Sequence, residues 1–347
     1  MKRLVEVTEA RELAGALLTE AGASMAHAAL QADLLIEAEL KGHPSHGLQR
    51  LPRLLMRVAN GLIDPTADGQ HSWRTDSVLD VDGERGFGPV VAMRALQALF
   101  ERSERTGIAL VGVRNSNHLG MLAYYVEHFA RRGRIVIALS TSEALVHPWG
   151  GRRAMLGTNP LAIGIPTAAR PFVLDLATGL VSMGKIHDHA MRGQPIQPGW
   201  ALDSDGNPTT NATRAKEGSI APFGGAKGYG IGLAIELLVA SLAGSALAPS
   251  VHGTLDAEHV ANKGDVFIVI DPPSNPQLAG MIEGYLDELR RSPAQDPARP
   301  VSVPGDGAHD RKTAALQHGL ELDDELWASL SALLVASSSP AFQDVAS

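Results

Sequence analysis

The chain has 347 residues, of which 44% are hydrophobic and 20% are charged, and its formal net charge is -8 at pH 7. This composition is typical of a globular protein large enough for two folding units, and the acidic balance argues against a general nucleic-acid binder. The absence of cysteine excludes disulfides, thiolate nucleophiles and cysteine-based metal sites. The N-terminus lacks the apolar stretch of a signal peptide, and no charge-free apolar run reaches the ~18 residues of a membrane span, so a cytoplasmic protein is expected.

The first part of the chain, from residue 9 to about 60, is predicted to be helical. Three hydroxyl residues are the expected N-caps of three successive helices, because their side-chain oxygens can accept an N–H of the first turn: Thr8, Ser24 and Ser45. The third helix should end at Asn60 and Gly61, a pair that tolerates a left-handed backbone. Pro52 lies inside this helix and is expected to kink or divide it.

A polar stretch between the second and third helices, residues 42–50, carries two histidines, a serine and an arginine. His46 and Arg50 are four residues apart, so on a helix that begins at Ser45 they would share one face. An imidazole that can move a proton and a guanidinium that can bind a carboxylate would then point into the same space. The plain structural alternative is a serine cap followed by a solvent-facing histidine and a surface arginine.

The middle of the chain alternates strands and helices. β-branched runs predict strands, and glycine, proline and apolar periodicity predict helices and turns. Strands are expected at 77–83, 108–113, 135–140, 172–178 and 265–272; helices at 88–100, 121–131, 226–242, 276–291 and 322–335; a hairpin or turn at 199–210; and an extended connector at 292–306. The predicted fold class is α/β, with a mixed-sheet domain at 77–275 and a mainly helical second lobe formed by 1–76 and 276–347.

Several other residues could carry chemistry, each with a plain structural alternative. His118 follows a strand and could face a ligand, although a hydrogen-bonded structural histidine would have the same position. The glycine-rich loop at 222–230, with Lys227, could approach phosphates or simply pack a helix start tightly. No GxGxxG follows the first strand and no GxSxG elbow is present, and His147, His187 and His189 lack a recognisable metal-ligand spacing. We therefore expect no metal site.

Seven motifs occur in the order seen in the malate/L-lactate/ureidoglycolate dehydrogenase family, which the chain resembles over nearly its whole length. This family also contains sulfolactate dehydrogenases and cyclic ketimine reductases. The motifs are SHG with RL at 45–51, SNHLG at 116–120, GTNPLA at 157–162, DLAT at 175–178, GKI at 184–186, GWALD at 199–203 and GGAKGYG at 224–230. Beyond Asp271 the resemblance is looser.

The resemblance implies a non-Rossmann nicotinamide-binding fold in a homodimer, with NAD or NADP as cofactor and a small carboxylate as substrate. By this resemblance His46 would exchange a proton with the substrate, Ser45 would orient it, and His118 competes for the same acid/base role. Arg50, Thr158 and Lys185 would bind the substrate. The cofactor contacts would come from His118, Leu119, Gly120, Met121, Leu122, Asp175, Leu176, Ala177, Ala226 and Lys227, and from Pro304 and Gly305.

The implied reaction agrees with the chemistry of these side chains. Hydride transfer to a 2-oxo acid leaves charge on oxygen, so a proton donor is needed near neutral pH, where histidine titrates. One position departs from the residue common in the family, and another differs between two branches of the family. Gly179 stands where many relatives have serine, and Lys185 matches hydroxy-acid dehydrogenases, whereas ketimine reductases tend to carry aspartate. A lysine would repel a protonated imine, which favours a 2-oxo/2-hydroxy acid substrate over the alternative, a piperideine- or pyrroline-2-carboxylate.

Overall fold

A computed structural model describes residues 2–337 of the chain. Its centre is a seven-stranded sheet, which is mixed as predicted: β3 and β4 are parallel, and the other neighbouring pairs are antiparallel. From one edge to the other the strands are β2 (Gln70–Trp73), β3 (Val78–Asp82), β4 (Ile108–Arg114), β11 (Asp265–Ile270), β5 (Ile135–Ser140), β6 (Leu161–Ile165) and β7 (Phe172–Leu176). The sequence did not predict β2 or β6.

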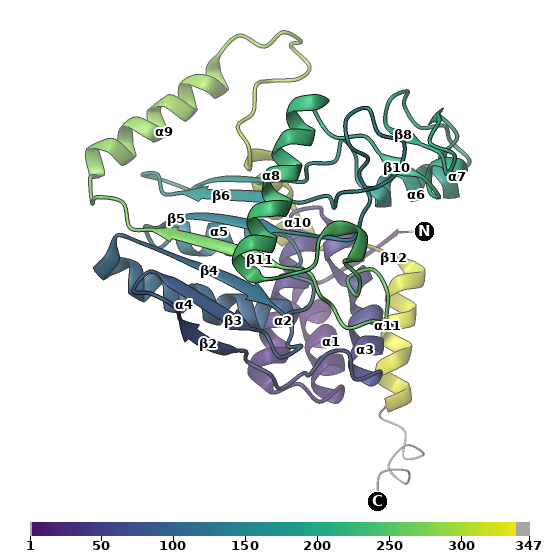
Figure 1. The fold of residues 1–347 in the computed structure, drawn as a ribbon, viewed down its shortest axis with the longest axis horizontal. Coiled ribbons are helices and arrows are strands. Elements are labelled where there is room, and N and C mark those ends of the chain that lie inside the picture. The colour runs from purple at the N-terminus through teal and green to yellow at the C-terminus, as the bar shows by residue number, and fades with distance from the viewer. Residues whose placement is uncertain (1, 338–347) are drawn as a thin grey trace, which may run out of the picture.

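Helices cover both faces of this sheet (Figure 1). On one face, α4 (Gly88–Thr106) and α5 (Ala123–Ala130) enclose a hydrophobic core around Tyr125, Phe129 and Phe267. On the other face, α8 (Ala226–Ala243) packs through Ile235 and Val239 on alternate residues of β5 and β11. Because successive side chains of a strand point to opposite faces, the central strands are apolar on both sides.

A helical layer joins the two ends of the described chain. It contains α1 (Val7–Glu20), α2 (Met25–Leu40), α3 (Leu51–Ala59), α10 (Asp306–His318) and α11 (Asp324–Ser337), and a two-stranded sheet of β1 (Lys2–Val5) with β12 (Leu320–Asp323). These elements share one hydrophobic core. The helix α9 (Pro276–Arg291) lies apart from them (Figure 1). The predicted division into two domains remains a prediction, and the part of it at 338–347 lies outside the described residues.

A smaller unit with its own core lies between β7 and α8. It consists of α6 (Met183–Met191), α7 (Ala212–Ala215) and a three-stranded sheet of β8 (Ala201–Leu202), β9 (Pro208–Thr209) and β10 (Ser219–Ile220). The expected hairpin at 199–210 is confirmed, since β8 and β9 pair antiparallel. The α8 helix that follows has the length and hydropathy of a membrane span, but it is the only such helix in residues 2–337 and it packs on the sheet.

The helix ends show where local signals decide and where they do not. Ser24 caps α2, accepting a hydrogen bond from the N–H of His27, and Gly61 ends the third helix with a φ of 69°. Thr8 is not a cap, because α1 begins one residue earlier, at Val7. Ser45 is not a cap either, since the chain forms two 3-10 helices before α3 starts at Leu51. Pro52 therefore lies in the first turn of α3, where its missing N–H costs nothing.

Candidate active site

The site is built where the end of α2 and the start of α3 meet the loop after β4. His46 and Arg50 lie in the 3-10 helices Pro44–His46 and Leu48–Arg50. The prediction that they share one face of an α-helix is therefore wrong. They nevertheless converge on His118. The Arg50 Nη2 atom is 3.1 Å from His118 Nε2, and the His46 and His118 rings are 5.5 Å apart. Ser45 Oγ lies 3.0 Å from His46 Nδ1, so the serine contacts the histidine that it was expected to orient.

Both ring nitrogens of His118 face an N–H group. The backbone N–H of Gly120 points to Nδ1 at 2.9 Å, while an Arg50 N–H points to Nε2. Burial first, and then the positive charge of Arg50, lower the pKa of His118 well below its usual value, so the ring is neutral. A neutral imidazole has one N–H and one lone pair, so it can accept only one of these two hydrogen bonds. One of the two N–H groups that face the His118 ring is therefore left without an acceptor there.

Arg50 is held in a way that leaves part of its guanidinium free for a ligand. Its Nε donates to the Ser45 carbonyl at 3.0 Å, and its Nη1 donates to the Thr254 carbonyl at 3.1 Å. A guanidinium carries two N–H groups on each terminal nitrogen, so one on Nη1 and at least one on Nη2 remain for another acceptor. That pair of donors matches the two oxygens of a carboxylate.

His46 is poised as a base in the absence of a ligand. Burial, followed by the nearby charges of Arg50 and His43, lowers its pKa to about 4. The imidazole is therefore neutral at pH 7 and can accept a proton. An anion bound at Arg50 would compensate one of the charges that lower this pKa, and protonation of His46 would become easier.

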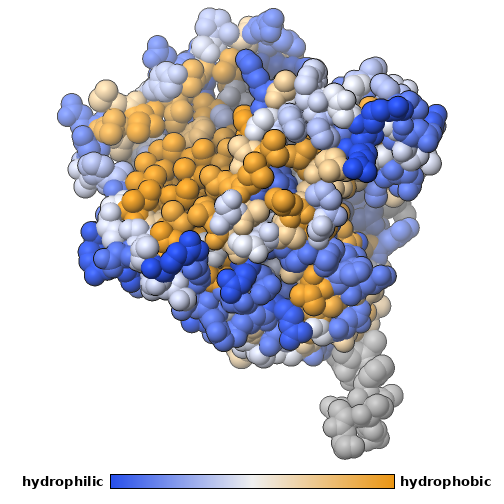
Figure 2. Space-filling model, in the orientation of Figure 1, coloured by the Kyte–Doolittle hydropathy of each residue, from blue (hydrophilic) through white to orange (hydrophobic). Residues whose placement is uncertain are grey.

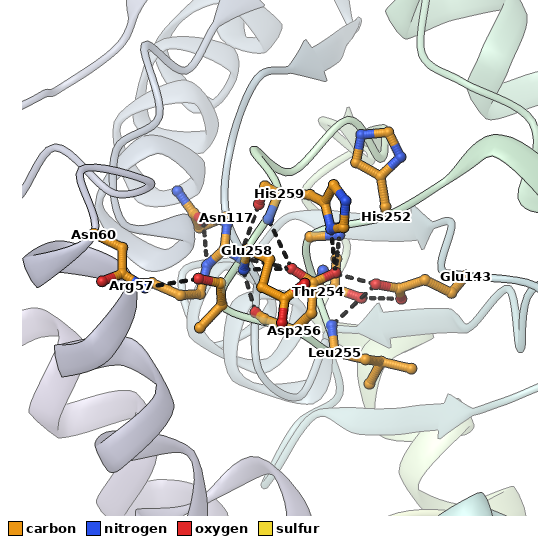
Figure 3. A network of polar contacts seen from close by, with 12 residues as sticks. Arg57, Asn60, Asn117, Glu143, His252, Thr254, Leu255, Asp256, Glu258 and His259 are labelled. Carbon is orange, nitrogen blue, oxygen red and sulfur yellow. Dashed lines mark hydrogen bonds and ion pairs between the residues drawn. The ribbon is translucent and has the colours of Figure 1, made fainter.

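One wall of the site is a loop that sequence analysis did not identify (Figure 3). The Glu143 carboxylate accepts hydrogen bonds from the backbone N–H groups of Thr254 and Leu255, at 2.7 and 2.9 Å, and from the Thr254 hydroxyl. From the other side, the buried Arg57 donates to the carbonyls of Asp256 and His259. The loop that contains Thr254 is thus fixed at two points.

A cavity of about 540 Å³ lies beside the helical layer, and several predicted cofactor residues line it. Asp175, Pro304 and Gly305 border it, and the Asp175 carboxylate accepts the N–H of Ala123 at 2.7 Å. Although Asp175 faces this open cavity, the surrounding protein desolvates its carboxylate and raises its pKa to about 6. Six basic side chains line the cavity, against three acidic ones: Lys41, Arg131, Arg170, Arg290, Arg311 and Lys312 against Glu127, Asp175 and Asp306.

The other predicted residues have no described hydrogen bond to the histidines. Thr158 donates its N–H to Ser142 Oγ at 3.0 Å, next to Glu143. Leu119, Met121 and Leu122 are buried in the core, so their backbone and not their side chains would meet a ligand. Leu176 ends β7, with Ala177 exposed after it.

Three predicted residues belong to the region around α6 and α8. Ala226 and Lys227 begin α8 and are exposed. Lys185 lies on α6, with its ammonium 4.8 Å from the Trp200 ring. The structure shows no contact from any of these residues to His46, Arg50 or His118. Within residues 2–337 no group of three His, Asp or Glu side chains is placed to hold a metal ion.

The fold and the paired histidine–arginine cluster define a class of α/β protein built to bind a small anion. The comparisons identify it: the family model described as malate/L-lactate dehydrogenase matches residues 5–331, so the chain belongs to that family. The family includes sulfolactate dehydrogenases and pyrroline-2-carboxylate reductases. The chain is accordingly an NAD(P)-dependent dehydrogenase of the malate/lactate/sulfolactate kind.

Three relatives illustrate the similarity. A dehydrogenase structure from Sinorhizobium meliloti has a TM-score of 0.92 and 56% identity, covering 96% of this chain and 98% of that chain. The malate/(S)-sulfolactate dehydrogenase of Methanothermus fervidus is 33% identical over 326 residues, which is 93% of this chain and 95% of the relative. The NADP(+)-dependent (2R)-3-sulfolactate dehydrogenase of Chromohalobacter salexigens is 35% identical over 292 residues, which is 83% of this chain and 85% of the relative.

Proposed function

We propose that the protein transfers a hydride between a nicotinamide cofactor and a small 2-oxo/2-hydroxy carboxylic acid. The observation that carries this proposal is the convergence of His46, Arg50 and His118, with donors left over for an anion. Arg50 would bind the substrate carboxylate through its free N–H groups and so orient the adjacent carbon. Thr158 and Lys185 would contact the substrate.

We assign different roles to the two histidines. The Gly120 N–H belongs to the backbone, so it keeps Nδ1 of His118 as the acceptor and leaves the ring proton on Nε2. A substrate oxygen between His118 and Arg50 would accept from both groups and remove the donor surplus. His118 would then polarise the substrate, and His46, oriented by Ser45, would take up or release the proton.

The residues of the large cavity fit a nicotinamide dinucleotide. Its excess of basic side chains suits phosphates, and Asp175, Pro304 and Gly305 line it. Leu176 and Ala177, which follow Asp175 in the chain, are further proposed contacts. The residues His118 to Leu122, with Ala226 and Lys227, would complete the cofactor site. When bound, the cofactor supplies the hydride, and the chain supplies binding, orientation and the proton.

Steady-state absorbance of NADH and NADPH oxidation tests the proposal with a panel of acids: pyruvate, oxaloacetate and 3-sulfopyruvate. Turnover of at least one acid is expected, and no turnover of any acid would refute the function. Piperideine-2-carboxylate belongs in the same panel, because its faster reduction would show a ketimine reductase instead. The positive charge of Lys185 on α6 speaks against that result.

We further propose that the protein is a homodimer. Figure 2 shows a broad apolar area on the face that carries α8 and α9. Four apolar side chains of these helices are 42–65% exposed: Leu237, Leu238, Met281 and Tyr285. An exposed apolar surface of this kind marks an interaction site, and a second copy of the chain would cover it.

A further inference from the structure

The loop at 253–259 contacts the candidate site through the backbone of Thr254. The Thr254 carbonyl accepts a hydrogen bond from Arg50 Nη1, and Arg50 in turn lies against His118. Arg50, His118, Gly253 and Thr254 line the same small cavity. A displacement of this loop would therefore change the position of the guanidinium that the proposed function uses to bind the substrate.

Glu143 holds the loop at the residue that contacts Arg50. One of its carboxylate oxygens accepts both backbone N–H groups, from Thr254 and Leu255, and the other accepts the Thr254 hydroxyl. These three hydrogen bonds fix the peptide planes on both sides of Thr254, so they also fix the direction of its carbonyl. Glu143 itself has no described hydrogen bond to Arg50 or His118.

Arg57 holds the same loop at its far end and connects it to the histidine segment. Its side chain is only 3% exposed. Nη1 donates to the carbonyls of Asp256 and His259 at 2.9 and 3.0 Å, and Nη2 donates to Asn117 Oδ1 at 2.9 Å. Asn117 immediately precedes His118 and is itself anchored to the carbonyl of Arg85 at 2.7 Å. One guanidinium thus sets the spacing between the loop and the histidine.

The loop is also stiffened from within. Asp256 accepts N–H groups from Gly253, Glu258 and His259 at 2.8 to 3.2 Å, and these bonds hold the pKa of its carboxyl below the usual value. The segment between the contacts of Glu143 and Arg57 therefore behaves as one unit. A change at either of these two residues is transmitted to the Thr254 carbonyl.

We propose that Glu143 and Arg57 are positioning residues, which clamp the loop at 253–259 from opposite sides and thereby place Arg50 and His118 for substrate binding. This inference rests on the proposed function. It predicts that loss of a clamp impairs recognition of the acid more than recognition of the nicotinamide, because the clamps act on the carboxylate-binding arginine. Neither residue takes part in the chemical step.

The test uses Glu143→Ala and Glu143→Gln in the full-length enzyme. Glutamine can accept both backbone N–H groups with its carbonyl oxygen and donate to the Thr254 hydroxyl, so it keeps the clamp and removes only the charge. We expect Glu143→Ala to raise the KM for the acid about 10- to 100-fold, with the KM for the nicotinamide within about threefold of wild type. Glu143→Gln should restore most of this loss. An unchanged acid KM in Glu143→Ala would overturn the inference.

Asp64→Ala is the matched control for a general loss of stability. Asp64 accepts the N–H and the hydroxyl of Thr66 at 2.9 and 2.8 Å, the same pattern as Glu143 with Thr254, but in an exposed turn. Thermal unfolding of each variant shows how much stability is lost. If Asp64→Ala raised the acid KM as much as Glu143→Ala, the effect would be general and the inference would fail.

Arg57→Lys provides a second test, because lysine keeps the charge and cannot donate to Asn117 and both carbonyls with the same geometry. We expect a higher acid KM in this variant too, and a folded variant with wild-type constants would contradict the role of Arg57. Calorimetric binding of oxalate separates the two proposals. If wild type binds oxalate without turning over any acid, and Glu143→Ala weakens that binding, the positioning role is supported and the proposed function is refuted. If wild type neither binds oxalate nor turns over any acid, both proposals are refuted.

Discussion

Two histidines 5.5 Å apart, close to one arginine, have different surroundings and should behave differently on mutation. The backbone N–H of Gly120 fixes the His118 ring, whereas His46 is free to gain a proton when a ligand compensates Arg50. Residues in the same cluster can therefore be assigned separate functions from the donors that face them.

Glutamine substitutions test this assignment. His118→Gln can keep an N–H near the Nε2 position, so we expect a loss in kcat of no more than about tenfold and a pH profile like that of wild type. His46→Gln removes the group that moves the proton and should reduce kcat about 10²- to 10⁴-fold. The measurement is the pH dependence of kcat/KM for oxidation of the 2-hydroxy acid that serves best. If the fall in kcat/KM at low pH disappeared in His118→Gln and persisted in His46→Gln, the assignment of the two roles would have to be reversed.

The lowered pKa of His46 also predicts how stability depends on pH. The folded state has a pKa of about 4 for this group, and an exposed histidine in the unfolded state has about 6.5, so the unfolded state binds the proton more strongly. The free energy of unfolding should therefore fall as the pH falls from about 6.5 towards 4. His46→Gln should lose less stability than wild type between pH 7 and pH 5 in urea titrations. His318→Gln, at an exposed position, should behave as wild type, and equal slopes for all three proteins would contradict the expectation.

The clamp residues show what the sequence could and could not indicate. Arg57 follows Arg50 by seven residues, which is two helical turns. The spacing alone could therefore have indicated that both side chains point the same way. Glu143 could not be found in this way, because its partner Thr254 is 111 residues away and isolated glutamates are common on surfaces. His46, Arg50 and His118 were identified by motif, and their approach depends on contacts across 68 residues or more of chain.

At the level of elements, prediction succeeded for long segments with a clear apolar pattern. It failed for short strands and for α10, a 13-residue helix that lacks such a pattern. The helix at 276–291 and the strands at 108–113 and 265–272 were located almost to the residue. β1, β2 and β12 have only four residues each, too few for an alternating pattern to stand out. The 3-10 helices before α3 depend on tertiary contacts, such as Glu39 accepting the N–H of Leu48 at 2.7 Å.

The turn between β4 and α5 should be sensitive to a single added methyl group. Gly120 has a φ of 71°, and a Cβ there would lie 2.2 Å from the Leu34 side chain. Gly120→Ala should therefore destabilise the protein by more than ~1 kcal/mol and displace the N–H that faces His118, which lowers activity in the folded fraction. The measurements are urea unfolding and kcat/KM.

Gly133→Ala is the control for backbone strain, because Gly133 also has a positive φ of 86° but open space around its Cβ position. It should lose some stability and keep wild-type kinetic constants. If the two variants had the same activity and the same stability, the turn would not matter for the site.

For the whole molecule, the exposed apolar face of α9 predicts the state of assembly. Only Leu286 of this helix is buried, while Met281 and Tyr285 are at least 60% exposed. Met281→Asp places a charge where we expect the second copy, so it should shift the protein from dimer to monomer in light scattering coupled to size-exclusion chromatography. Leu316→Asp, at an exposed position on α10, should leave the dimer intact. A wild-type protein that elutes as a monomer would refute the proposal.

The antiparallel pairing of β1 with β12 has a consequence for how the chain reaches its final form. Lys2 pairs with Asp323 and Val5 with Leu320, so β1 can pair only after β12 has been synthesised. The helical layer can be completed only after β12 has been synthesised, and until then its apolar interior is open to chaperones.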